Sequence, residues 1–244
     1  MRVSIVQFAP LWEDRAGTRA KLAYIFESTP VETDWMVFPE MALSGFSMNL
    51  SATTWKDEDY QFFQSQARRK NCYLTVGAVE NAQNTALVFQ PDGNILARYA
   101  KRHLFSPSGE SDSYQAGNSP CHYEVGDLNI AQNICYDLRF PDAFWSSAAQ
   151  VNVYCIIAAW PNRRAEHWKA LLRARAIENQ AFVIGVNRTG SEPESNYSGD
   201  SLLIDPQGKT ILDCGEKEGI FTSGIEVGLV RDWRGAFPIL SDRL

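Results

Sequence analysis

The sequence has only three histidines among its 244 residues, no CxxC pair, no glycine-rich phosphate loop and no extended block of lysine or arginine. With 23 basic and 29 acidic residues, its formal charge is −6. Phosphate binding needs a clustered basic face, so we expect no nucleic-acid partner. Three histidines without ligand spacing give no case for a metal site. We therefore expect neither a metal nor another cofactor.

A long apolar run is also absent. The longest one, residues 153–160, is far shorter than the roughly 18 residues that suggest a membrane span. The N-terminus turns polar too soon for a secretory signal, because Pro10, Glu13 and Asp14 follow its first apolar segment. The five cysteines are odd in number, which predicts neither a disulfide framework nor a zinc knuckle. We expect a cytoplasmic protein that does not contact a membrane.

What the sequence does contain is an alternation of apolar, strand-like segments with polar, amphipathic ones. Near-continuous apolar strands predict sheets covered on both faces, and the alternation predicts an α/β layer architecture. The strands are many for one sheet, which favours two packed sheets with helices outside. The length favours one domain over residues 1–244. The expected strands are 2–8, 34–39, 72–79, 86–90, 94–100, 122–125, 128–134, 153–159, 182–187, 201–205, 210–214 and 220–226.

Four amphipathic segments predict helices, at residues 13–28, 57–70, 142–150 and 163–180. The last of these is the most strongly periodic. Its apolar residues along one side are Ala170, Leu171, Ala174, Ile177 and Ala181.

Three reactive side chains, Glu40, Lys101 and Cys135, each directly follow a strand-like segment. In α/β folds, functional groups gather beyond strand ends, where loops hold them over a crevice. A carboxylate, an ammonium and a thiol in equivalent places can serve as base, oxyanion stabiliser and nucleophile. The three positions therefore predict one site.

The chemistry of a thiol explains why all three groups are needed. A free thiol has a pKa near ~8.5, so only a few per cent is thiolate at neutral pH. The carboxylate of Glu40 can take the thiol proton and return it to departing ammonia. Lys101 and a backbone N–H such as that of Tyr136 can stabilise the oxyanion, and losing one such donor slows a reaction ~100–1000-fold. Opposite charges also allow Glu and Lys to share an apolar pocket.

Each residue also has a purely structural interpretation. Free cysteine is among the most buried residue types, and we assign Cys72, Cys121, Cys155 and Cys214 to that role. A lone Glu40 could face solvent, and Lys101 could form a solvated basic pair with its neighbour. A Cys–His hydrolase that uses His103 remains an alternative nucleophile scheme.

Seven sequence blocks carry a resemblance that runs in order along nearly the whole chain: FPEMALSGF (38–46), KRHLF (101–105), SPSGESDSYQAGN (106–118), ICYDLRFPD (134–142), AAWP (158–161), LLRARAIENQAFVIGVNRTG (171–190) and GDSLLIDPQG (199–208). With these blocks the sequence resembles the nitrilase superfamily of carbon–nitrogen hydrolases. Within it, AAWP and RARAIENQAFVIGVNR are most similar to the bacterial omega-amidases.

The resemblance implies a four-layer α-β-β-α sandwich with pseudo-symmetric halves, assembled as a homodimer. It implies Glu40 as general base, Lys101 as transition-state stabiliser and Cys135 as nucleophile. A second family glutamate maps onto Glu110, which would orient Lys101 and the attacking water. Omega-amidases hydrolyse α-keto acid amides such as 2-oxoglutaramate and 2-oxosuccinamate. We therefore expect a small-molecule amide substrate and a thioester on Cys135.

For the substrate pocket, we expect Phe46, Tyr136 and Trp160 to form walls. The carboxylate of a keto acid needs a cation when it leaves water, and Arg164 is the first candidate, with Arg139 second. Both arginines could instead pair with carboxylates between elements. Two alternatives stay open: another amide-like substrate (deaminated glutathione, an N-carbamoyl amine or a nitrile), or a non-catalytic family member that acts as a binding protein.

Overall fold

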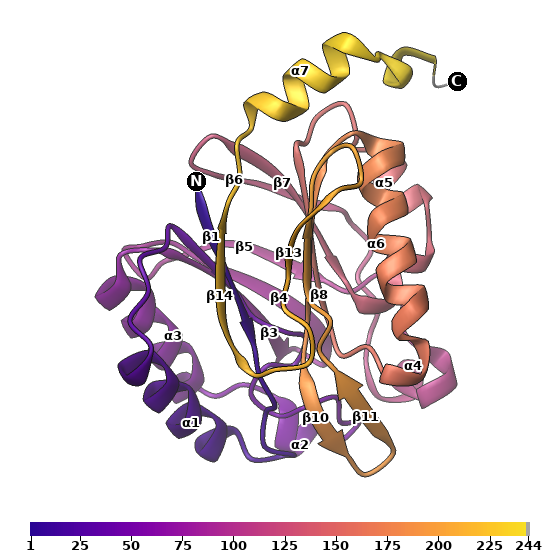
Figure 1. Ribbon diagram of the computed structural model, residues 1–244. Coiled ribbons are helices and arrows are strands. Elements are labelled where there is room, and N and C mark those ends of the chain that lie inside the picture. Colours follow the sequence, from indigo (N-terminus) through magenta and orange to yellow (C-terminus); the bar gives the residue numbers. More distant parts are fainter. Residues whose placement is uncertain (243–244) are drawn as a thin grey trace.

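The computed structural model describes residues 1–242, in which two six-stranded sheets pack against each other (Figure 1). The strand order of the first sheet is β14-β1-β2-β3-β4-β5. Its strands are β1 (Arg2–Gln7), β2 (Trp35–Val37), β3 (Tyr73–Glu80), β4 (Gln83–Phe89), β5 (Ile95–Ala100) and β14 (Gly219–Gly224). The strand order of the second is β13-β12-β9-β8-β7-β6. Its strands are β6 (Cys121–Val125), β7 (Leu128–Ile134), β8 (Val153–Ala158), β9 (Phe182–Asn187), β12 (Leu202–Ile204) and β13 (Thr210–Asp213).

The two halves of the chain repeat one topology. In the first sheet, β1, β2 and β3 are parallel, and β4 and β5 continue antiparallel. In the second sheet, β7, β8 and β9 are parallel, and β12 and β13 continue antiparallel. Each sheet also has an antiparallel edge strand on its other side, β14 next to β1 in the first sheet and β6 next to β7 in the second. This repetition confirms the expected pseudo-symmetric halves.

Helices cover the outer faces of both sheets, so the layers run helix, sheet, sheet, helix (Figure 1). In that view α1 (Arg15–Ser28) and α3 (Asp57–Lys70) lie outside the first sheet, and α5 (Asp142–Trp145) and α6 (Ala165–Asn179) lie outside the second. The other helices are α2 (Leu50–Thr53), α4 (Glu110–Ser113), α7 (Gly228–Ala236), and the 3₁₀ turns η1 (Ser106–Ser108), η2 (Cys135–Arg139), η3 (Asn162–Arg164) and η4 (Ile239–Asp242). The expected α/β four-layer sandwich is confirmed.

One apolar cluster joins the two sheets, with Ile5 and Val88 from the first and Ile130 and Ile156 from the second. Burial of such side chains is the main favourable term in folding. No helix within residues 1–242 combines the length and apolar character that crossing a membrane requires.

Helix α3 has the predicted bounds because its charges match its dipole. Acidic residues occupy its first turn and basic residues its last, and both placements stabilise a helix. It ends at Asn71, whose left-handed backbone (φ 50°) stops the helix. The buried Asp59 pairs with Arg15 and Arg19 and so ties α3 to α1.

Two expectations about helices are wrong. The segment 142–150 is helical only to Trp145, because Ser146 and Ser147 bond their hydroxyls to backbone carbonyls and compete with helix continuation. In α6 the apolar side chains predicted to lie along one side do not form the buried face, since Ile177 is 48% exposed. The buried face instead includes Trp168, Leu172 and Ala176. The large Trp and Leu side chains pack against Gly185 of β9, where a Cβ atom would leave them no room.

A short hairpin, β10 (Thr189–Glu192) and β11 (Ser195–Ser198), projects from the end of β9 and was not predicted. Its residues are mostly polar, so they lack the apolar alternation that marks a strand in sequence. It lies at the end of the molecule opposite α7 (Figure 1).

Candidate active site

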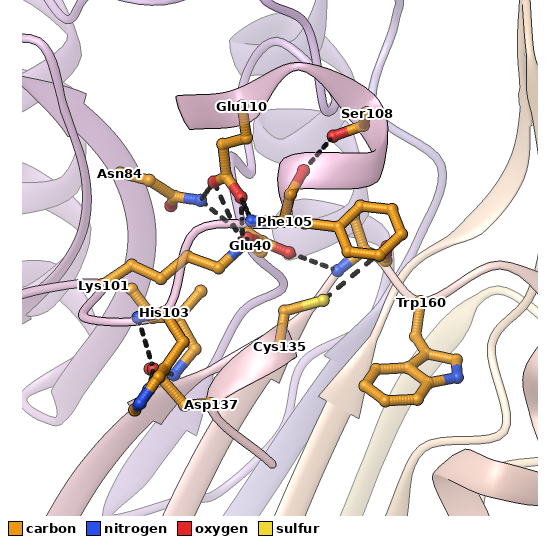
Figure 2. A network of polar contacts seen from close by, with 12 residues as sticks. Glu40, Asn84, Lys101, His103, Phe105, Ser108, Glu110, Cys135, Asp137 and Trp160 are labelled. Carbon is orange, nitrogen blue, oxygen red and sulfur yellow. Dashed lines mark hydrogen bonds and ion pairs between the residues drawn. The ribbon is translucent and has the colours of Figure 1, made fainter. Parts of the chain in front are cut away.

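The carboxylates of Glu40 and Glu110 meet the amine of Lys101 where no solvent reaches any of the three side chains (Figure 2). The Lys101 Nζ lies 2.8 Å from Glu40 Oε1, and 3.0 and 2.8 Å from the two Glu110 oxygens. Cys135 is 8% exposed, and its thiol lies next to the Glu40 carboxylate and donates to the Ala159 carbonyl at 3.9 Å (Figure 2). The structure therefore brings together the four residues that the sequence and the family resemblance single out.

Strand ends supply these side chains. Glu40 follows β2, Lys101 follows β5, and Cys135 follows β7 and opens η2. Close packing behind Glu40 requires a glycine at position 77 of the neighbouring strand, because a Cβ there would lie 2.5 Å from the Glu40 Cα. Glu110 comes from α4, a single helical turn in a segment that was expected to be a loop.

The backbone at Cys135 has a left-handed conformation, with φ of 46°. Non-glycine residues rarely adopt it, and where they do the surrounding structure must hold them. Here Asp137 holds the turn, since its buried carboxylate accepts hydrogen bonds from the backbone N–H groups of Ile134 and His103 and from the Tyr99 hydroxyl. This anchoring fixes where the thiol points.

His103 contributes to the same anchor. Its Nδ1 lies 2.7 Å from Asp137 Oδ1, and its ring stacks on Phe140 with centroids 3.9 Å apart. His103 therefore contacts Asp137, the residue that holds the turn. The group next to the Cys135 thiol is the carboxylate of Glu40. The geometry favours the Glu–Lys–Cys arrangement over a Cys–His pair.

The electrostatics of the cluster keep the amine charged and the resting thiol neutral. Burial alone would lower the pKa of Lys101, but the charges of Glu110 and Glu40 raise it well above its ordinary value. Burial raises the pKa of Cys135 well above its ordinary value, the Glu40 carboxylate raises it further, and Lys101 opposes this. A base is therefore needed at the moment the sulfur attacks.

A cavity of about 490 Å³ opens onto Cys135, and Phe46, Tyr136, Trp160 and Arg164 all line it, as expected. Arg139, the second candidate for the substrate carboxylate, lines it too.

The arginines of the cavity are held by stacking. Arg139 stacks on the Trp160 ring at 4.7 Å, and Arg164 on the Phe105 ring at 5.2 Å. Within residues 1–242, neither makes an ion pair with a carboxylate. Burial and the charges of Arg163 and Arg139 lower the pKa of Arg164. Clustered cations of this kind suit an anionic group of a ligand.

Sequence reasoning missed two parts of the site. Asn84, at the start of β4, donates to the carboxylates of both Glu40 and Glu110, and the expected strand began only at residue 86. The sequence offers no clear signal for it, because Asn84 stands between the polar residues Gln83 and Thr85, and asparagine is depleted from strands. The second part is the hairpin β10–β11, which supplies Glu192 and Tyr197 to the cavity wall. Within residues 1–242 no three His, Cys, Asp or Glu side chains are grouped to hold a metal.

Comparison with known proteins supports the resemblance. The family described as carbon-nitrogen hydrolase matches residues 2–235. The chain is 32% identical to the 2-oxoglutaramate amidase of Bacillus subtilis, over 98% of this chain and 96% of that one. It is 36% identical to the omega-amidase YafV of Escherichia coli K12, over 99% and 96%. A crystal structure of a CN-hydrolase superfamily protein from Xanthomonas campestris, with an arsenic adduct in its active site, superposes with a TM-score of 0.94 at 32% identity, covering 100% of this chain and 97% of that one.

Proposed function

The chain belongs to the carbon–nitrogen hydrolase family, and from this membership we propose that it is a cysteine amidohydrolase that releases ammonia from the omega-amide of a small α-keto dicarboxylic acid. The observation that carries the proposal is the solvent-free Glu40–Lys101–Glu110 cluster beside the thiol of Cys135. A base, a cation and a nucleophile held in one dry place are what acyl transfer needs.

The reaction runs in two stages. Cys135 attacks the amide carbon as Glu40 takes the thiol proton, and Lys101 and the Tyr136 N–H stabilise the oxyanion. Tyr136 lies in the first turn of η2, where N–H groups have no partner within the helix. The intermediate collapses to a thioester as the proton passes to departing ammonia. Water then attacks the thioester with Glu40 as base, while Glu110 orients Lys101 and that water.

Two features support a keto-acid amide as substrate. Relatives at 32% and 36% identity over nearly the whole chain are named 2-oxoglutaramate amidase and omega-amidase. Arg139 and Arg164 also line the cavity without carboxylate partners in the described part of the chain, and the carboxylate of a keto acid could form an ion pair with them. We assign this carboxylate to Arg164, with Arg139 as the second candidate, between walls formed by Phe46, Tyr136 and Trp160.

The test is ammonia release from 2-oxoglutaramate by the wild type and by Cys135→Ala. The variant should release no ammonia above background and form no covalent adduct, whereas Cys121→Ala, the change of a half-buried thiol elsewhere, should leave the rate unchanged. A Cys135→Ala protein that keeps the wild-type rate contradicts the mechanism. A protein that is folded but hydrolyses no amide would instead be a binding protein of this family.

A second candidate substrate, deaminated glutathione, is favoured by one observation. A polar hollow of about 360 Å³ adjoins the cavity and shares Pro161, Arg163 and Glu192 with it, which leaves room for a larger leaving group. Comparing kcat/KM for 2-oxoglutaramate, deaminated glutathione and an N-carbamoyl amine decides between them. If the keto-acid amide were the poorest of the three, the substrate assignment would fail.

We also propose that the protein works as a homodimer in the cytoplasm and that residues 1–244 form one domain. Large apolar side chains support an association surface, since Trp145 of α5 and Ile177 of α6 are 45% and 48% exposed. Sedimentation equilibrium tests the dimer, and a monomer at micromolar concentration would contradict it. Cell fractionation tests the location.

A further inference from the structure

Asn84 bridges the two catalytic carboxylates. From the start of β4 its side-chain amide donates to Glu40 Oε1 at 2.6 Å and to Glu110 Oε1 at 2.7 Å (Figure 2). Its backbone carbonyl accepts from the Lys101 N–H at 2.8 Å, so one residue contacts every charged member of the cluster. The residue is fully buried.

The orientation of this amide follows from charge. Turned the other way, the Asn84 carbonyl oxygen would face two carboxylates, which repel it. In the observed orientation both N–H bonds are used, and the Oδ1 atom is buried without a hydrogen-bond partner in the described part of the chain. A buried polar atom is ordinarily paired, so its isolation here indicates that the two bonds to the carboxylates dominate.

The bonds of Asn84 leave Glu40 one free acceptor position. A carboxylate offers about two acceptor positions on each oxygen. Both positions on Oε1 are filled, one by Lys101 and one by Asn84. Among residues 1–242, Oε2 accepts only the N–H of Ala159, at 2.8 Å, so one position on it stays open. The carbonyl of the same Ala159 accepts from the Cys135 thiol at 3.9 Å, which places the sulfur on the Oε2 side of the carboxylate.

We infer that Asn84 is a positioning residue that makes Oε2 of Glu40 the atom that receives the thiol proton. In this step the S–H bond of Cys135 breaks, an O–H bond forms at Oε2, and the sulfur electron pair attacks the amide carbon. The same proton then leaves with ammonia. This inference rests on the proposed function.

A second consequence concerns Lys101. Lys101 has three N–H donors, and at rest its Nζ contacts Glu40 once and both oxygens of Glu110. An oxyanion can receive one of these donors only if each carboxylate then draws a single one. Asn84 supplies the additional donor that both carboxylates need. Without Asn84, Lys101 would be drawn further toward the carboxylates and away from the substrate.

The experiment compares the wild type with Asn84→Ala and with the similarly sized Asn84→Leu. We expect kcat to fall by up to about a hundredfold with KM changed little, because substrate binding does not involve Asn84. We also expect the acidic limb of the pH–rate profile to move to higher pH. The reason is that a carboxylate which loses a hydrogen-bond donor holds its proton more tightly.

The matched control is Thr85→Val. Thr85 is the next residue on the same strand, is equally buried, and donates only to the Gln83 carbonyl. Its pH profile should be unchanged. An unshifted acidic limb in a folded Asn84→Leu or Asn84→Ala protein overturns the inference, whatever the loss of rate. The proposed function fails separately, if the wild type hydrolyses no amide or if Cys135→Ala stays active.

Discussion

Glu192 accepts a hydrogen bond from the backbone N–H of Phe46 at 2.8 Å, although the two residues are 146 positions apart. The same carboxylate pairs with the fully buried Arg188 and accepts from the Tyr197 hydroxyl at 2.6 Å. The Phe46 ring lies 5.2 Å from Lys101 Nζ. The hairpin β10–β11 therefore holds the Phe46 wall of the cavity over the amine of Lys101.

Glu192→Gln should weaken both stability and substrate binding. Without the carboxylate charge, the buried Arg188 loses its partner, which costs about 3 kcal/mol of unfolding free energy. KM should rise, because an uncharged amide oxygen accepts the Phe46 N–H less strongly than the carboxylate does. Denaturant unfolding and steady-state kinetics measure the two effects. Glu194→Gln, a change at the exposed hairpin tip, should leave stability unchanged, and equal stability of the two variants would contradict the role of Glu192.

A double variant separates the two effects of Glu192. Arg188→Met with Glu192→Leu replaces the buried pair by apolar side chains, so the unfolding free energy should return toward that of the wild type. Leucine offers the Phe46 N–H no acceptor, so KM should be at least as high as in Glu192→Gln. A double variant as unstable as Glu192→Gln would show that the unpaired charge of Arg188 is not the cause.

Glu40→Gln should lose hydrolysis while its thiol becomes more acidic. The charge of Glu40 and its hydrogen bond raise the pKa of Cys135, and Lys101 lowers it. Removing the carboxylate therefore moves the midpoint of iodoacetamide alkylation at Cys135 to lower pH. Ammonia release should fall by about 100- to 10,000-fold, because no base remains to move the proton. An unchanged or higher midpoint would show that Glu40 does not control the thiol.

Arg164→Met should raise KM for a keto-acid amide by about tenfold to a hundredfold, the range for one hydrogen bond to a charged group. An uncharged amide of similar length should be hydrolysed with little change, because it offers no carboxylate. The same kinetics with Arg139→Met show which arginine binds the carboxylate. If both variants kept the wild-type KM, the anion would lie elsewhere in the cavity.

The cluster of Glu40, Lys101 and Cys135 could be predicted from the sequence because each of them follows a strand-like segment. β2 and β7 belong to the parallel parts of their sheets, and β5 runs in the same direction as β2 because two antiparallel pairings separate it from β3. Glu110 came only from the family resemblance. It lies in a polar block without periodicity, and its burial depends on partners such as Asn84 and Lys101 in other elements.

The remaining errors share a physical cause. The sequence of α6 shows which residues are apolar, but it does not show which of them are buried. Burial depends on the fit of side chains against the sheet, here of Trp168 and Leu172 against Gly185. The hairpin β10–β11 is held by the ion pair between Arg188 and Glu192, so it needs no alternation of apolar residues that a sequence pattern would show. Contacts between distant positions decide both features, and a local pattern does not contain them.

The single-domain proposal predicts one cooperative unfolding transition, because the chain closes its first sheet with its last strand. The register of β14 on β1 runs from Arg2 opposite Gly224 to Gln7 opposite Gly219, so the second half of the chain completes the sheet of the first. The apolar cluster between the sheets couples them further. Tryptophan fluorescence and far-UV circular dichroism should therefore give coincident denaturant curves.

Deleting residues 219–244 tests the same point from the other side. The deletion exposes the edge of β1 and removes the strand by which the second half of the chain completes the first sheet, so both sheets should lose stability together. A truncated protein in which the second sheet keeps its full protection against hydrogen exchange, while only the first becomes labile, would mean that the halves fold as two units. Joint loss of stability is the expected result, because β14 closes the first sheet and one apolar cluster couples the two sheets.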